Sequence, residues 1–234
     1  MRLSKTIVLN GTVSFIAAPA AATAAQLSVV TVSAPAVNCV FEADCTITVT
    51  DSVGKIPLPN LTSGEARLQT RTFAGKPPAP AGGKTGYEYR VDLTTAVTNL
   101  EFSCVTDLAV DFGPVTKLQY NNVPPTDDVY VVTHGGLGKI GILNAEQNGS
   151  LITFTFSQPV CAGQSPNTGE STFFFGLTSA FGPHAVTAKV GLPGLLPADV
   201  GARGPNHSAS PERPERPAPP TAHPTDQTET NPRQ

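Results

Sequence analysis

The sequence has no tryptophan, and its only methionine is residue 1. Charged residues make up 14% of the chain, well below the roughly 25% of typical globular domains. No segment of ten or more residues places apolar side chains at helical spacing between caps, which argues against a parallel βαβ architecture. Val, Thr, Phe and Gly are plentiful instead, and this composition favours an all-β protein.

Positive charge is scarce as well. Residues 25–191 carry nine Lys or Arg against thirteen Asp or Glu, a net charge of −4, with no basic stripe. We therefore expect no nucleic acid partner. Beyond the N-terminus, no apolar segment approaches the roughly 20 residues needed to cross a bilayer, so we expect no membrane span in the mature chain.

The N-terminus does hold an apolar run. Arg2 and Lys5 precede a mostly apolar stretch over residues 6–20, and Ala22-Thr23-Ala24 fits the A-x-A cleavage rule. We predict that residues 1–24 are a secretory signal peptide and that the protein is secreted or periplasmic. The alternative is an N-terminal β-strand, because parts of this run are β-prone.

Four cysteines follow the predicted signal peptide: Cys39, Cys45, Cys104 and Cys161. An even number in an exported chain indicates two disulfides, for which three pairings are possible. We favour a bridge between Cys39 and Cys45, because their spacing suits two neighbouring strands joined by a short turn. Cys104 would then pair with Cys161. A zinc site is the rival interpretation, but no C-x-x-C or H-x-x-x-H spacing accompanies these residues.

Strand signals recur along the chain, most of them 8 to 14 residues after the one before. Thr46-Ile47-Thr48-Val49-Thr50 shows the alternation of apolar and hydroxyl side chains that a strand with one buried face requires. The predicted strands are residues 27–33, 37–41, 46–50, 67–73, 87–93, 100–105, 108–112, 117–120, 129–133, 140–143, 151–156, 172–177 and 185–190. About a dozen short antiparallel strands predict a two-sheet β-sandwich, with a β-barrel as the alternative.

Three local patterns refine this prediction. Asn148-Gly149 predicts a type I′ hairpin. Phe173-Phe174-Phe175 requires either a central strand covered on both faces or one exposed phenylalanine. Residues 75–86, GKPPAPAGGKTG, predict a flexible hairpin tip that buries nothing.

The composition changes near residue 191. Ten prolines lie between Pro193 and the end, with PERPERP at residues 211–217 and no aromatic residue. We therefore predict a β-sandwich domain over residues 25–191 and a disordered Pro-rich tail over residues 192–234.

No pattern predicts a catalytic or cofactor site, and we expect no cofactor. Residues 136–141 match G-x-G-x-x-G, but no helix can follow before the turn at residue 148, so we expect a glycine-rich β-loop. His134 and His184 are the histidines outside the tail, and no G-x-S-x-G motif accompanies them.

Other polar side chains allow weaker hypotheses. Asp107 and Asp111 share a strand face, and with Asp127-Asp128 they could hold calcium, although no EF-hand loop is present. Tyr87 and Tyr89 share another face and could form a small binding surface, although packing is the commoner use of such pairs.

The sequence therefore supports a general functional hypothesis only. We expect an exported structural or adhesive module, and we favour a binder of an extracellular ligand or surface partner over an enzyme. The alternative is a carboxylate-dependent hydrolase acting on an extracellular polymer. A third possibility is a subunit of a surface assembly whose edge strand is completed by a neighbour.

Overall fold

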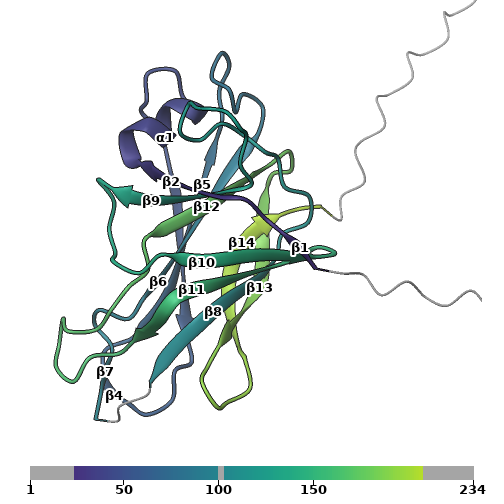
Figure 1. Cartoon of the computed structure of the whole chain (residues 1–234). Helices are drawn as coiled ribbons and strands as arrows, with labels where there is room; N and C mark the ends of the chain where they lie inside the picture. Colours follow the sequence, from purple (N-terminus) through teal and green to yellow (C-terminus); the bar gives the residue numbers. More distant parts are fainter. Residues whose placement is uncertain (1–23, 100–102, 208–234) are drawn as a thin grey trace, which may run out of the picture.

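The computed structural model describes residues 24–99 and 103–207, which form two six-stranded sheets packed against each other (Figure 1). Fourteen strands and one helix lie in this part of the chain. The predicted two-sheet sandwich is confirmed, and the described strands do not close into a barrel.

Sheet A contains six strands. In spatial order they are β1 (Ala25–Gln26), β10 (Ile142–Asn148), β11 (Leu151–Cys161), β8 (Cys104–Asp111), β13 (Pro183–Gly191) and β14 (Ala198–Pro205). All neighbouring pairs in this sheet are antiparallel.

Sheet B also contains six strands. In spatial order they are β2 (Val29–Ser33), β9 (Val129–His134), β12 (Phe174–Ser179), β6 (Thr85–Asp92), β5 (Ala66–Ala74) and β3 (Thr50–Ile56). Only the edge pair β2 and β9 is parallel. The short strands β4 (Leu61–Ser63) and β7 (Val97–Thr98) form a separate pair.

The N-terminal segment crosses from one sheet to the other between β1 and β2. Asp128 holds this crossing, because its Oδ2 accepts hydrogen bonds from Ser28 N at 2.9 Å, Ser28 Oγ at 3.0 Å and Lys117 Nζ at 2.8 Å. Burial raises the pKa of the Asp128 carboxyl, but the hydrogen bonds from Lys117 and Ser28 outweigh it and hold the pKa below its ordinary value.

The main core lies between the two sheets and is rich in aromatic rings. Tyr89, Phe154 and Phe175 form a cluster with ring centroids 4.8 to 6.3 Å apart. The buried Tyr89 hydroxyl donates to Arg203 O of β14 at 2.8 Å, so the polar end of a core side chain links sheet B to sheet A. These contacts do the packing that tryptophan supplies in many sandwiches.

A second core covers the outer face of sheet B. Helix α1 (Ala34–Phe41) lies at the end of β2, next to β9, and buries Val37, Val40 and Phe41 (Figure 1). The predicted strand 37–41 is therefore wrong. Buried positions three and four residues apart suit a helix, and Pro35 sits in its first turn, but eight residues are too few to show a clear helical period.

Two other predicted strands are also wrong. Of residues 46–50, only Thr50 joins a strand, since the segment before it has no partner strand and lies across the outer face of sheet B with Ile47 inward. Residues 117–120 form only the isolated bridge of Leu118 with Asp127. Of the predicted strand 100–105, residues 100–102 lie outside the described residues.

The remaining local predictions fare better. Phe174 and Phe175 of β12 are buried on opposite faces of sheet B, as a covered central strand requires. The hairpin between β10 and β11 is confirmed, but its turn lies one residue later than predicted: Asn148 pairs with Leu151, and Gly149 has a φ of +61°. This places glycine first in the two-residue loop, as in a type II′ turn rather than type I′.

Residues 75–84 connect β5 to β6 as the predicted tip, but the tip does bury side chains. Ala81 is fully buried, and its N–H donates to Val40 O of α1 at 2.8 Å. Lys76 N likewise donates to Phe41 O at 2.8 Å. The tip therefore fixes α1 on sheet B, which the polar, Pro-rich composition of this segment did not indicate.

The predicted domain boundary at residue 191 is too early. β14 pairs with β13 along its whole length and buries Val200 and Ala202 in the main core. β14 also lies close to β3, where a Cβ at residue 54 would collide with the carbonyl of Gly201. The described domain therefore continues to residue 207. Residues 1–23 of the predicted signal peptide and residues 208–234 lie outside the described residues.

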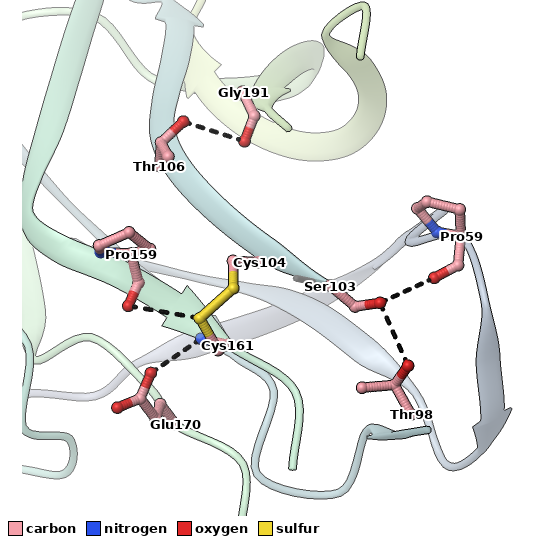
Figure 2. Close-up of a disulfide and its surroundings, with 9 residues drawn as sticks. All are labelled: Pro59, Thr98, Ser103, Cys104, Thr106, Pro159, Cys161, Glu170 and Gly191. Atoms are coloured by element: carbon pink, nitrogen blue, oxygen red, sulfur yellow. Dashed lines mark hydrogen bonds between the residues drawn. A yellow bond between two sulfur atoms is a disulfide. The ribbon is translucent and has the colours of Figure 1, made fainter. Parts of the chain in front are cut away.

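Two disulfides join Cys39 to Cys45 and Cys104 to Cys161, in the favoured pairing. Cys39 lies in α1 and Cys45 in the loop after it, so this bridge closes a helix end rather than joining two strands. Cys104 and Cys161 are directly opposite on β8 and β11, beyond a bulge between Thr155 and Val160 (Figure 2). The second bridge therefore links β8 and β11 covalently next to Val160 and Val105, where their pairing resumes after the bulge.

Candidate binding pocket on the outer face of sheet B

A pocket of about 240 Å³ opens on the outer face of sheet B. Strands β5, β6, β9 and β12 form its floor, and α1, the segment before β3 and the loop after β9 form its walls. The lining residues are Ala34, Val37, Asn38, Ile47, Val49, Arg71, Glu88, Val132, Gly135, Gly136, Leu137 and Phe174. The walls are mostly apolar, and the charged groups lie on the floor.

A polar row crosses the sheet beneath this pocket. The strand registers place Asp51 opposite Arg71, Arg71 opposite Glu88, Glu88 opposite Gly176, and Gly176 opposite Tyr130. Directly opposite residues share a face of the sheet, so this row spans five strands. The side chain of Tyr130 passes over Gly176, and a Cβ on Gly176 would lie only 2.6 Å from the Tyr130 hydroxyl. That hydroxyl donates to Glu88 Oε1 at 3.3 Å.

The two arginines near the floor are already engaged. Arg71 Nε contacts Asp51 Oδ1 at 3.0 Å, and its guanidinium lies 4.1 Å from the centroid of the Phe174 ring. The Arg90 guanidinium lies 5.8 Å from the centroid of the same ring, pairs with Asp92 at 3.0 Å and donates to Ser171 Oγ at 3.1 Å. Each guanidinium thus has its own aspartate.

Glu88 has no such partner. It is only 5% exposed, and in the described part of the chain no Lys, Arg or His nitrogen lies within 4.0 Å of its carboxylate. Burial raises the pKa of Glu88 to about 7, although Arg71 and the Tyr130 hydroxyl act in the opposite direction. A carboxyl that lines a pocket in this state can accept or donate a proton near neutral pH.

The residues singled out from the sequence lie elsewhere. Tyr87 and Tyr89 point into the main core, so the binding-surface hypothesis for this pair is wrong. His184 Nδ1 lies 3.0 Å from Gly204 O, at the β13–β14 pair. His134 is exposed at the end of β9, with Nδ1 3.0 Å from Thr133 Oγ1. The G-x-G loop after it is irregular, as expected, and Gly136 lines the pocket.

The acidic residues considered for calcium do not gather. Asp107 accepts a hydrogen bond from Thr106 Oγ1 at 2.8 Å, Asp111 lies 3.4 Å from His207 Nε2, and Asp128 holds the strand crossing. Within residues 24–99 and 103–207, no three His, Cys, Asp or Glu side chains are arranged to hold a metal ion. No helix in those same ranges is long and apolar enough to cross a membrane.

Sequence reasoning missed Arg71 and Glu88. Glu88 stands on a strand that alternates cleanly, Tyr87-Glu88-Tyr89-Arg90-Val91, where the charged positions predict a solvent-exposed face, and Arg71 lies opposite it on that face. That face is buried only because α1, the segment at residues 47–49 and the loop at residues 135–137 fold over it. No short-range pattern in the sequence predicts that these three segments cover the face.

Comparisons with protein-family models, curated proteins and solved structures found no match to this chain. The evidence for the candidate site is therefore its geometry alone.

Proposed function

We propose that this protein is an exported binding module, structural or adhesive in role, and that the pocket over Glu88 is where it takes its ligand or surface partner. The observation that carries the proposal is a buried carboxyl without an ion pair on the floor of a pocket whose walls are mostly apolar. Burying such a group is unfavourable for folding, so a site of this kind fits binding better than stability.

Export is the second part of the proposal. Two disulfides are typical of proteins that fold in an oxidising compartment, and residues 1–24 have the pattern of a secretory signal. A secreted or periplasmic protein would meet its ligand outside the cytosol.

A fragment screen monitored by ¹H–¹⁵N NMR tests the site. We expect hits to shift the amide signals of Gly135, Gly136 and Leu137, and Val49→Trp to abolish those shifts by filling the pocket from its rim. The control is Val53→Trp, which changes an exposed residue of β3, the strand that follows Val49, and Val53 does not line the pocket. A library that leaves these three signals unmoved in the wild-type protein would contradict the proposal.

The competing hypothesis, a carboxylate-dependent hydrolase, has its own test. Turnover would be measured on a panel of glycans and esters with the wild-type protein and with Asp107→Asn and Asp111→Asn. We expect no turnover. Reproducible activity that is lost in those two variants would favour the hydrolase instead.

A further inference from the structure

We propose that the pocket binds a primary alkylammonium group, with the Glu88 carboxylate as its counter-ion and the apolar walls around its methylene chain. This inference rests on the proposed function, because it names the ligand class of the same pocket.

The charges on the floor favour a cation. With its carboxyls ionised, the row formed by Asp51 of β3, Arg71 of β5 and Glu88 of β6 has a net charge of −1, and Tyr130 of β9 adds none. Arg90 is balanced by Asp92. An anionic ligand would face Glu88 without compensation, whereas a ligand with one positive charge would neutralise the row.

The walls favour an aliphatic chain. Val37, Ile47, Val49, Val132 and Phe174 surround a space of about 240 Å³, which suits a chain of a few methylene groups rather than a large ring system. Such a chain would bury apolar surface and leave its charged end on the floor, as lysine side chains do at many apolar surfaces.

The acceptors at Glu88 favour an ammonium over a guanidinium. Tyr130 already donates to Glu88 Oε1, so the two oxygens are not equally free for the parallel pair of bonds that a guanidinium forms. An ammonium has three rotatable N–H donors and can use Oε2 alone. Asn38, which also lines the pocket, brings an amide oxygen as a second kind of acceptor.

The test is an NMR titration of the folded protein with n-pentylamine, 1-pentanol and pentanoate at pH 8. We expect pentylamine to shift the Gly135, Gly136 and Leu137 signals at a concentration at least about tenfold lower than pentanol, and pentanoate to have no effect. Glu88→Gln should remove the preference for the amine and keep the weak response to pentanol. Glu146→Gln, on an exposed position of β10, is the matched control and should behave as the wild type.

The wild-type protein also tests the proposal without any variant. Because the pKa of Glu88 is about 7, affinity for pentylamine should fall at least about tenfold between pH 8 and pH 5.5, while affinity for pentanol stays constant. An equal response to amine and alcohol, or a preference for pentanoate, would overturn the ammonium assignment and leave the pocket as a binding site. No response to any of the three would also overturn the ammonium assignment, whereas the proposed function fails only if the fragment library gives no response either.

Two sources of the ammonium can be separated in the same experiment. Nα-acetyl-lysine methylamide carries the lysine side chain within a peptide-like backbone. If it binds as well as pentylamine, the site takes lysine side chains presented by a partner protein. If only the free amine binds, the site takes small alkylamines.

Discussion

At the scale of single residues, the most informative position is Glu88. The residues on either side of Glu88 in the sequence, Tyr87 and Tyr89, are fully buried in the main core. The Glu88 side chain is buried on the opposite face of the same strand. A central strand covered on both faces thus carries a carboxyl that water barely reaches. This makes the folded state sensitive to the protonation of one group.

We expect Glu88 to lower stability as pH rises. Its pKa increases from 4.5 to about 7 on folding, because burial penalises the charged form. The folded protein therefore keeps a proton that the unfolded chain releases, and the contribution of Glu88 to the free energy of unfolding falls by about 3 kcal/mol between pH 4.5 and pH 7.

Urea unfolding of the wild type and Glu88→Gln across this pH range checks the expectation. The difference in stability should shift in favour of the variant as pH increases and level off above pH 7, since glutamine does not titrate. Glu146→Gln should follow the wild type at every pH. A constant difference between Glu88→Gln and the wild type would show that Glu88 has an ordinary pKa.

At the scale of elements, Gly54 allows the edge strands of the two sheets to lie close together at one side of the sandwich. Edge strand β3 of sheet B approaches edge strand β14 of sheet A so closely that residue 54 has no room for a Cβ. Gly201, whose carbonyl blocks that space, has open space at its own Cβ position. The two glycines therefore differ in what they contribute.

Alanine at these positions should separate the two cases. We expect Gly54→Ala to destabilise the protein by about 1–3 kcal/mol, because β3 and β14 must move apart. Gly201→Ala should change stability by no more than about 0.5 kcal/mol. Thermal unfolding of both variants measures this, and equal stability would mean that the two strands can separate at no cost.

The bridges also act on elements, and the longer one should matter more. Replacing Cys104 and Cys161 by alanine removes a disulfide between two residues that are 57 positions apart in the sequence. On the loop-entropy model this loss lowers the free energy of unfolding by about 4 kcal/mol. Replacing Cys39 and Cys45 opens a separation of only 6 residues and should cost about 2 kcal/mol. Denaturant unfolding of the two double variants gives the ranking, and the opposite order would contradict this account.

At the scale of the whole molecule, the proposed export and the two disulfides can be tested on the same sample. If residues 1–24 are cleaved, the protein recovered from the periplasm or medium should begin at Ala25, and its intact mass should increase by about four hydrogens on reduction, two for each disulfide. N-terminal sequencing and mass spectrometry check both points. An uncleaved N-terminus on the exported protein would favour the β-strand alternative for this segment.

Much of the architecture could be read from the sequence. The alternation in residues 87–93 predicted β6, because apolar side chains at every second position need a strand with one face in the core. The even number of cysteines predicted two bridges. Helix α1 and strand β14 could not be read in this way, because one is too short for a helical period and the other is dominated by small residues and glycine.

The sequence by itself determined an all-β protein with two disulfides, since residue composition and alternation report which faces of a strand meet water. Only the tertiary structure decided that Glu88 and Arg71 lie beneath a pocket. Their strands present charged side chains on the outer face of sheet B, and three segments distant in sequence cover that face: α1, residues 47–49 and residues 135–137. Burial of a charged position depends on these long-range contacts, and no local pattern encodes them.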